Sequence, residues 1–281
     1  MSNSNAELSF EFFPPRTDKG FENLSKVQTA LAKFNPTFFS VTYGAGGSTQ
    51  EGTFDAVKSI LDTGSAAAPH LTCVGASHDL IKTTVQQYLD VGVRRIVVLR
   101  GDLPSGMVER GDFKYAEDLV RFIRQEFGDD LHLEVAAYPD FHPESANPLT
   151  DIQYLKRKFD AGASSAITQY FYNADSYFAF VDEAQHMGVN APIVPGIMPI
   201  TNYATLVRFS DACGAELPRW IRSRLEQYQN DEASLKAFGI DVVTHLCHDL
   251  LDNDVPGLHF YALNKLDPTT QICRNLGIIE Q

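Results

Sequence analysis

Eight short runs rich in β-branched and aromatic residues alternate along this chain with longer segments whose apolar residues recur at helical spacing. Such alternation is typical of parallel strands joined by crossover helices. Eight strand–helix units favour an α/β fold of the closed (β/α)8 type, the TIM barrel, over an open doubly wound sheet. The expected strands are Leu8–Phe13, Phe38–Tyr43, His70–Val74, Ile96–Arg100, Leu133–Ala137, Ala166–Phe171, Ile193–Ile197 and Leu258–Ala262.

Glycines indicate where several helices return to a strand. Gly92, Gly162 and Gly188 each follow a segment of helical period and precede an expected strand. Glycine adopts the left-handed conformation that ends a helix without steric cost. These three positions therefore support the strand and helix boundaries.

The interval before the last strand is longer than the others. It has room for an additional helical pair, expected at Tyr203–Ala212 and Asp231–Leu251, with Pro218 and Trp220 in the connection. No linker rich in glycine, serine or proline separates this interval from the rest. We therefore predict an insertion on the barrel rim, and one domain spanning residues 1–281.

Charge and hydropathy exclude several classes of function. The chain has 281 residues and a formal net charge of -13, so its average surface repels nucleic-acid phosphates and anionic lipid headgroups. The N-terminus lacks a basic start followed by an apolar run, so it does not resemble a signal peptide. No apolar stretch approaches the roughly 20 residues of a membrane helix. We expect a cytoplasmic protein that binds neither nucleic acid nor membranes.

The four cysteines are scattered through the chain without a C-x-x-C pair. They are Cys73, Cys213, Cys247 and Cys273. A disulfide framework and a structural zinc site both need closer or paired cysteines, so reduced, mostly buried thiols are expected.

A carboxylate interrupts the first expected strand. Alternation in Ser9–Phe13 places Glu11 on the face opposite Phe10 and Phe12, so that Glu11 points into the barrel if the two phenylalanines contact the helices. Partial desolvation would raise its pKa and suit it to donate a proton near neutral pH. A structural ion pair with Arg100 is the alternative.

Other polar residues stand where expected strands end, which is where barrel enzymes place their chemistry. After strand four, Arg100 and Asp102 flank Gly101, whose lack of a side chain allows a ligand to approach the backbone. A tight turn stabilised by Asp102 would also explain that motif. His70, Tyr138, His142, Thr168 and Gln169 follow other strands. This ring of mostly neutral hydrogen-bonding groups suits a planar heteroaromatic ligand better than a divalent cation.

Searches for other motifs are mostly negative. The Gly44–Thr49 segment resembles a dinucleotide fingerprint but lacks its third glycine. His245 and His248 lie three apart on an expected helix with no third ligand, so we predict no metal site.

At these strand ends the sequence resembles the methylenetetrahydrofolate reductase family, from about Leu8 to Gly277. The matching blocks, in order, are SFEFFPPR, SVTYGA, PHLTC, LRGDLP, AAYP with HPE, YLKRKFDAGA, AITQ, VPGIMPI and LHFYALN. The resemblance implies a barrel that binds FAD, accepts hydride from NADH or NADPH, and passes it to methylenetetrahydrofolate in alternating half-reactions to give 5-methyltetrahydrofolate. It covers the catalytic barrel alone, without the regulatory domain of eukaryotic relatives. We also expect a homo-oligomer.

The resemblance assigns roles residue by residue. Glu11 matches the general acid that protonates the folate, and Asp102 matches the acid near the flavin. Gln169 matches the amide that holds the pterin, and Phe209 matches a mobile aromatic that stacks on folate or nucleotide. Thr205 and Lys265 complete the expected substrate-binding set. The expected FAD-binding residues are Thr42, Tyr43, His70, Arg100, Gly101, Asp102, Tyr115, Ala116, Tyr138, His142, Asp151, Arg157 and Lys158.

The sequence departs from the family pattern at three positions. Lys265 stands where close relatives commonly have arginine, and a lysine cannot form a bidentate clamp on a carboxylate. Asp140 replaces a glutamate or lysine, and Thr205 replaces a glutamine. These three changes therefore affect the expected contacts with the folate tail and the nucleotide.

Two other functions are compatible with a pterin-binding barrel. One is methyl transfer without a flavin, which needs an acceptor such as a zinc thiolate or cobalamin, and the cysteine pattern offers no cluster for it. The other is a non-catalytic flavin or folate binder, against which the presence of both Glu11 and Asp102 argues. Bound FAD would make the purified protein yellow.

Overall fold

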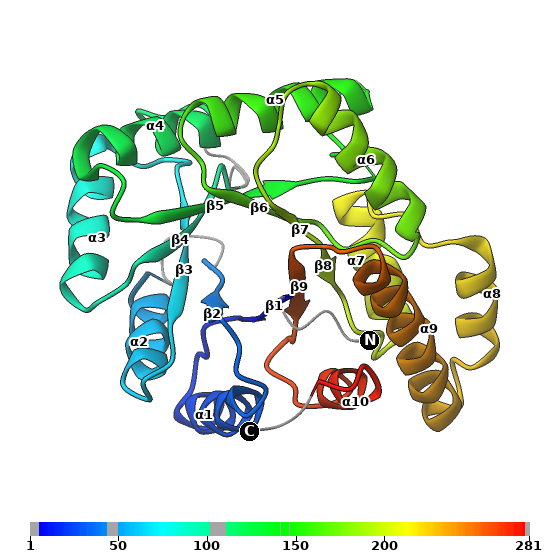
Figure 1. The fold of residues 1–281 in the computed structure, drawn as a ribbon. Coiled ribbons are helices and arrows are strands. Elements are labelled where there is room, and N and C mark those ends of the chain that lie inside the picture. Colours follow the sequence, from blue (N-terminus) through cyan, green and yellow to red (C-terminus); the bar gives the residue numbers. More distant parts are fainter. Residues whose placement is uncertain (1–5, 44–49, 102–110, 141, 146, 279–281) are drawn as a thin grey trace.

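A computed structural model describes residues 6–43, 50–101, 111–140, 142–145 and 147–278. Within these ranges all strands are parallel and belong to one sheet, in the order β7-β6-β5-β4-β3-β2-β1-β9-β8. The strands are β1 (Glu7–Phe12), β2 (Phe38–Val41), β3 (Ala67–Thr72), β4 (Arg95–Leu99), β5 (His132–Ala137), β6 (Ser165–Thr168), β7 (Ile193–Val194), β8 (Gly196–Ile197) and β9 (Gly257–Tyr261). They curve around a common centre (Figure 1).

The barrel closes through one strand that is divided in two. β7 pairs with β6 and β8 pairs with β9, and only Pro195 separates the two halves. Proline has no backbone N–H and cannot donate to the sheet, but the Pro195 carbonyl still accepts from the His259 N–H at 3.0 Å. β7 and β8 are therefore the predicted seventh strand, and the expected (β/α)8 barrel is confirmed.

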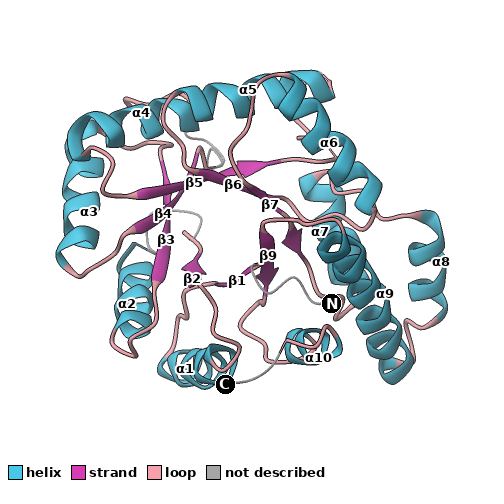
Figure 2. Cartoon of the chain, in the orientation of Figure 1, coloured by secondary structure: helices cyan, strands magenta, loops and turns pink. Residues whose placement is uncertain are grey.

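Helices surround the strands as an outer ring (Figure 2). They are α1 (Asp18–Ala32), α2 (Gln50–Leu61), α3 (His78–Asp90), α4 (Ala116–Phe127), α5 (Pro148–Asp160), α6 (Ala174–His186), α7 (Tyr203–Cys213), α8 (Arg219–Gln227), α9 (Glu232–Asp252) and α10 (Thr269–Asn275). Gly92, Gly162 and Gly188 have φ of 98°, 113° and 87°, which confirms them as helix-ending glycines. In the described part of the chain, no helix is both long and apolar enough to cross a membrane.

The interval before β9 contains three helices, so the predicted helical pair was incomplete. α7 and α9 lie within one residue of their expected bounds, but Trp220 belongs to a further helix, α8, and not to a connection. Pro218 immediately precedes this helix, where its fixed φ is tolerated. Ile221 and Leu225 form its buried side, four residues apart. The helix has only nine residues, fewer than the roughly 11–18 over which helical periodicity is read from a sequence.

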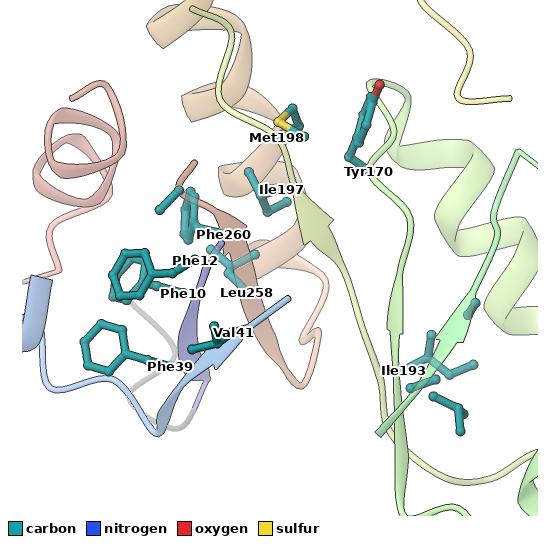
Figure 3. Close-up of a cluster of buried hydrophobic side chains, with 14 of the residues drawn as sticks. Phe10, Phe12, Phe39, Val41, Tyr170, Ile193, Ile197, Met198, Leu258 and Phe260 are labelled. Atoms are coloured by element: carbon teal, nitrogen blue, oxygen red, sulfur yellow. The ribbon is translucent and has the colours of Figure 1, made fainter. Parts of the chain in front are cut away.

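The outer face of the barrel carries the main core. Phe10, Phe12, Phe39 and Phe260 gather on adjacent strands with ring centroids 5.4–5.9 Å apart, as Figure 3 shows. Each is at most 1% exposed. Because these even-numbered β1 residues pack outward, Glu11 must point into the barrel, as the alternation predicted.

Inside the barrel, the side chains form layers. Phe38, Ala68, Val97 and Ile167 make a small apolar layer of their own. At the end where the strands begin, Glu134 is 1% exposed and is paired with Arg95. The lumen is therefore filled below its mouth, and space for a ligand is confined to the carboxyl ends of the strands.

Candidate active site

Glu11 is the centre of a polar cluster in the barrel mouth. Its Oε2 lies 3.1 Å from Nε2 of His70 on β3 and 3.5 Å from Nε2 of His259 on β9. The Ser40 hydroxyl on β2 donates to the same oxygen at 3.4 Å, and the Glu11 side chain is 16% exposed. Four neighbouring strands thus converge on one carboxyl group.

The strand register explains this convergence. Glu11 is level with Ser40 on one side and with Tyr261 on the other. His259 precedes Tyr261 by two residues and so faces the same lumen. Its Nδ1 lies 2.7 Å from the Ser9 hydroxyl, which orients the imidazole so that Nε2 faces Glu11.

The predicted rise in the pKa of Glu11 was wrong for this arrangement. Burial does raise the pKa, but the attraction of His70 and His259 outweighs burial and lowers the pKa to about 2. The alternative of an ion pair with Arg100 is also wrong, because Arg100 is paired with Glu144 at 2.8 Å. The carboxylate is therefore ionised.

His259 and Ser40 were not predicted from the sequence as members of this cluster. Both stand on strands that were correctly expected, at positions whose side chains face the lumen. The alternation rule that selected Glu11 would have selected them once the neighbouring strands were placed in register. Register between strands far apart in sequence is what the sequence does not provide.

A second group of predicted residues lies at the ends of β4 and β5. Tyr138 and His142 contact edge to face with centroids 4.7 Å apart, and the His142 Nδ1 accepts from the Glu144 N–H at 3.1 Å. Glu144 carries the ion pair to Arg100. These contacts bring together the strand-four and strand-five residues that were expected to bind the cofactor.

Two charged residues of α5 are held inward beside this group. The Asp151 carboxylate accepts from the His142 N–H and from the Ser145 hydroxyl, and it is 7% exposed. Lys158 donates its Nζ to the Ala136 carbonyl at 2.5 Å. Burial lowers the pKa of Lys158 to about 8, although Asp151 counteracts part of this effect. A partly buried ammonium that donates to a neutral carbonyl can still bind an anion.

The start of α4 contributes an exposed aromatic edge. Tyr115 precedes Ala116, the first residue of α4, and its ring stacks on Tyr154 of α5 at 6.5 Å. The Arg157 guanidinium lies 5.3 Å from the Tyr154 ring centroid. Tyr154, which sequence reasoning missed, thus connects Tyr115 to Arg157.

The ends of β2 and β4 carry further predicted cofactor-binding residues. Thr42 follows β2, and its N–H donates to the Phe12 carbonyl at 2.9 Å, with Tyr43 next along the chain. Gly101 has φ of 83°, and a Cβ there would lie 2.9 Å from the Thr72 Cβ, so the strand end admits no side chain. Asp102 and the Gly44–Thr49 segment lie outside the described residues.

The predicted substrate residues are more dispersed. Gln169 directly follows β6, and its Oε1 accepts from the Tyr170 N–H at 3.0 Å. Thr205 and Phe209 lie on α7, where Phe209 is 36% exposed and has the Arg208 guanidinium 5.3 Å from its ring centroid. Lys265 follows the carboxyl end of β9 and lines a cavity there with Phe13, which follows β1.

The donor set determines which ligands the mouth can accept. Nε2 of His70 and Nε2 of His259 are buried and face the Glu11 carboxylate, but among the described residues neither makes a contact with hydrogen-bond geometry. In the same part of the chain, no group of three or more His, Cys, Asp or Glu side chains is arranged to hold a metal ion. The mouth offers two imidazole edges, and the cationic residues Arg157 and Lys158 belong to α5.

Fold and site together define a class: a (β/α)8-barrel enzyme with an acid–base cluster in its mouth and cationic side chains beside it. The family model described as methylenetetrahydrofolate reductase matches residues 1–277. The chain belongs to the methylenetetrahydrofolate reductase family.

Individual relatives agree with this assignment. The chain is 39% identical over 272 residues to the 5,10-methylenetetrahydrofolate reductase of Salmonella typhimurium, covering 96% of this chain and 90% of that one. The Escherichia coli protein of the same name is 38% identical with the same coverage. A protein of Arabidopsis thaliana named methylenetetrahydrofolate reductase (NADH) 1 is 37% identical over 98% of this chain and 49% of its own length.

Solved structures share the fold at low sequence identity. A Clostridium thermocellum protein described as binding two copies of 5-methyl-5,6,7,8-tetrahydrofolic acid has a TM-score of 0.69 at 16% identity, covering 98% of this chain and 94% of its own. An oxaloacetate acetylhydrolase has a TM-score of 0.55 at 14% identity, covering 97% of this chain and 81% of its own. At 16% and 14% identity, the likeness concerns the barrel fold alone.

Proposed function

We propose that this protein reduces methylenetetrahydrofolate to 5-methyltetrahydrofolate with hydride from NADH, by way of a bound FAD. Family membership supports the reaction, and the name of the plant relative supports NADH as the donor. The single structural observation that carries the proposal is the position of Glu11 in the mouth, between His70 and His259. A cytoplasmic location, a homo-oligomer and a single domain stay predictions.

The residues at the ends of β4 and β5 fit a flavin dinucleotide. A diphosphate needs cations in a protein of net charge -13, and Arg157 and Lys158 stand on one turn of α5. Tyr115 and Tyr154 offer stacked aromatic surface beside them. When bound, FAD would accept hydride from the nucleotide and donate it to the folate.

The remaining predicted cofactor contacts come from the strand ends. His70, Thr42 and Gly101 would face the polar edge of the flavin ring, and Arg100, Tyr138 and His142 would hold the chain that links ring and phosphate. Asp102 is proposed to act near the flavin on the basis of the family pattern. Gln169 would hold the pterin, and Phe209 would stack on the substrate.

The proton required by the folate is supplied through Glu11. Protonation of the folate opens its five-membered ring to the reactive iminium, and that step needs an acid within hydrogen-bonding distance. Since the Glu11 carboxylate is ionised and lies between two imidazoles, we propose that Glu11 passes the proton to the folate and that His70 and His259 position its carboxyl group. The Ser9 hydroxyl keeps His259 in the orientation that this transfer needs.

Anaerobic stopped-flow absorbance tests the proposal directly. The as-isolated protein should be yellow, NADH should bleach the flavin band, and methylenetetrahydrofolate should then restore it. Parallel mixing with NADPH measures the nucleotide preference. A colourless protein that neither nucleotide reduces would reject the proposal and favour a flavin-free methyltransferase.

A further inference from the structure

Helix α7 carries two of the predicted substrate residues, yet apolar packing constrains its orientation weakly. Leu206 is its one large apolar side chain that is fully buried, and three other apolar residues of the helix are partly buried. By comparison, α9 buries eight residues along its length. Because an α-helix turns by about 100° per residue, a modest rotation would redirect Thr205 and Phe209. Hydrogen bonds must therefore contribute to how α7 is oriented.

The first of two such hydrogen bonds comes from the segment after β5. The Asp140 carboxylate accepts from the Glu216 N–H at 2.9 Å, and Glu216 lies between α7 and α8. Asp140 is half-buried and also has a hydrogen bond with the Ser176 side chain in the first turn of α6. Its carboxylate thus joins three segments that are distant in the sequence.

The chain around Glu216 is held in place by its neighbours. Gly214 ends α7 with φ of 76°, so the chain changes direction there. Ala215 and Leu217, on either side of Glu216, are each 6% exposed, whereas the Glu216 side chain is exposed. Asp140 therefore contacts a fixed backbone segment and not a long, mobile side chain.

The second hydrogen bond comes from the segment after β6. Tyr170, labelled in Figure 3, directly follows Gln169 and is 3% exposed. Its hydroxyl lies 3.1 Å from the Ser210 hydroxyl, and Ser210 directly follows Phe209 on α7. The Gln169 Oε1 accepts from the Tyr170 N–H at 3.0 Å. The expected pterin contact and α7 are therefore connected through Tyr170.

We propose that Asp140 and Tyr170 are positioning residues that hold α7 in the orientation in which it contacts the folate. The inference rests on the proposed function, which places Phe209 against the substrate. Thr205 and Phe209 are four residues apart and share one side of the helix. The contact at Ser210 fixes the direction in which that side faces, and the contact of Asp140 just beyond the helix fixes where α7 ends.

Substrate binding by Asp140→Ala tests the first contact. Reoxidation of the NADH-reduced holoenzyme by increasing concentrations of methylenetetrahydrofolate gives a Kd and a limiting rate. Without an acceptor for the Glu216 N–H, the Kd should rise by about three- to tenfold, while the limiting rate changes little. Asp140→Asn keeps a carbonyl oxygen at this position and should restore most of the wild-type Kd. Equal Kd values for Asp140→Asn and Asp140→Ala would overturn a role through this hydrogen bond.

The dependence on Phe209 separates positioning from a general loss of stability. If Asp140 acts by orienting α7, Asp140→Ala should raise the folate Kd much less in a Phe209→Ala background than in the wild type. The reason is that the contact which Asp140 aligns is already absent in that background, so the two effects are not additive. Equal fold-changes in the two backgrounds would overturn the inference.

Tyr170→Phe tests the second contact and remains informative if Asp140→Ala does not fold. It removes the hydroxyl that contacts Ser210 and keeps the buried ring, and the freed Ser210 hydroxyl can bond to a carbonyl one turn earlier in α7. We expect the folate Kd to rise by about two- to fivefold. Asp175→Ala is the matched control, since it removes an exposed carboxylate next to Ser176, and its Kd should equal that of the wild type.

Three further outcomes would count against these assignments. An unchanged folate Kd in both Asp140→Ala and Tyr170→Phe would overturn the inference while leaving the reductase activity established. A shifted flavin absorption band in either variant would also overturn it, because the substitution would then act on the flavin site and not on α7. If methylenetetrahydrofolate does not reoxidise the reduced wild-type protein, the proposed function itself is rejected.

Discussion

At the scale of single residues, the chemistry of Glu11 depends on its neighbours more than on its own burial. Desolvation alone would hold the carboxyl protonated, but His70 and His259 reverse the sign of the pKa shift. The sequence predicted the direction in which the side chain points and misjudged its protonation state, because the two imidazoles come from strands 59 and 248 residues away (70 − 11 and 259 − 11).

The substitution Glu11→Gln should separate the two half-reactions. Flavin reduction by NADH should remain nearly unchanged, since no proton is needed on the nicotinamide, whereas folate reduction should fall by about 10²- to 10⁴-fold. Stopped-flow traces of each half-reaction measure the two rates. Glu7→Gln, at the exposed start of the same strand, is the matched control. Equal losses in both half-reactions would contradict the assigned role.

Lys158 should make stability depend on pH in a defined window. Its pKa is about 8 in the folded protein against an ordinary 10.5, so between these values the unfolded chain binds more protons than the folded one. Stability should therefore rise with pH from about 8 to 10.5, by at most about 1.4 kcal/mol per pH unit.

Denaturant unfolding of flavin-free protein measures this contribution. The unfolding free energy of the wild type, minus that of Lys158→Met, should increase as the pH rises across that window. A bound diphosphate would favour the charged ammonium, so FAD should flatten the slope. A slope that is the same with and without FAD would argue against Lys158 as a phosphate contact.

At the scale of elements, the divided strand β7–β8 shows how tightly the barrel closes. Gly196 lies so near β6 and β9 that a Cβ would be 2.1 Å from the Thr168 carbonyl oxygen and 2.7 Å from the Tyr261 hydroxyl. The Gly196 N–H donates to the Thr168 hydroxyl, and the Tyr261 hydroxyl donates to the Thr168 carbonyl. Backbone and side chains of three strands thus meet just below Gln169.

Gly196→Ala should therefore be strongly destabilising. The backbone of β6 must move to accept the methyl group, which we expect to cost about 3 kcal/mol or more. Thermal or denaturant unfolding measures the loss, and any folded protein should also show a higher KM for folate because Gln169 shifts. Gly52→Ala is the control, since its Cβ would meet only ordinary contacts at 3.7 Å. Equal stability of Gly196→Ala and Gly52→Ala would contradict the close packing of β6, β8 and β9 at Gly196.

At the scale of the whole molecule, the two ends of the barrel have different tasks. The carboxyl ends of the strands carry the candidate active site. At the other end, Glu134 is paired with Arg95, and its Oε2 accepts from the Ser165 hydroxyl at 2.5 Å. His132 lies 3.1 Å from the other carboxylate oxygen. This cluster closes the lumen and is separated from Glu11 by the apolar layer around Phe38 and Val97.

Removing Glu134 from the cluster that it forms with Arg95, Ser165 and His132 should reduce stability and leave catalysis nearly unchanged. Glu134→Ala leaves the partly buried Arg95 guanidinium without its carboxylate, which should cost about 3 kcal/mol. The double variant Glu134→Leu, Arg95→Met should be closer to the wild type, since no unpaired charge remains. Denaturant unfolding gives the free energies, and kcat per folded molecule should stay within about twofold. A large loss of kcat would show that the two ends of the barrel are energetically coupled.

Much of this molecule follows from local patterns in its sequence. Strand and helix periodicity predicted the barrel, helix-ending glycines predicted the returns, and alternation in β1 predicted the direction of Glu11. These are short-range properties, because they depend on residues a few positions apart. Helix α8 was missed because its nine residues are too few for the periodicity to be recognised.

The tertiary structure decided what depends on contacts between distant strands. The histidines around Glu11, the connection of Tyr115 to Arg157 through Tyr154, and the hydrogen bonds that hold α7 each join residues from separate elements. Strand register and closure at Pro195 bring these residues within reach, and electrostatic interactions then determine which of them carry charge. Such energies depend on distances in space, which the order of residues along the chain does not specify.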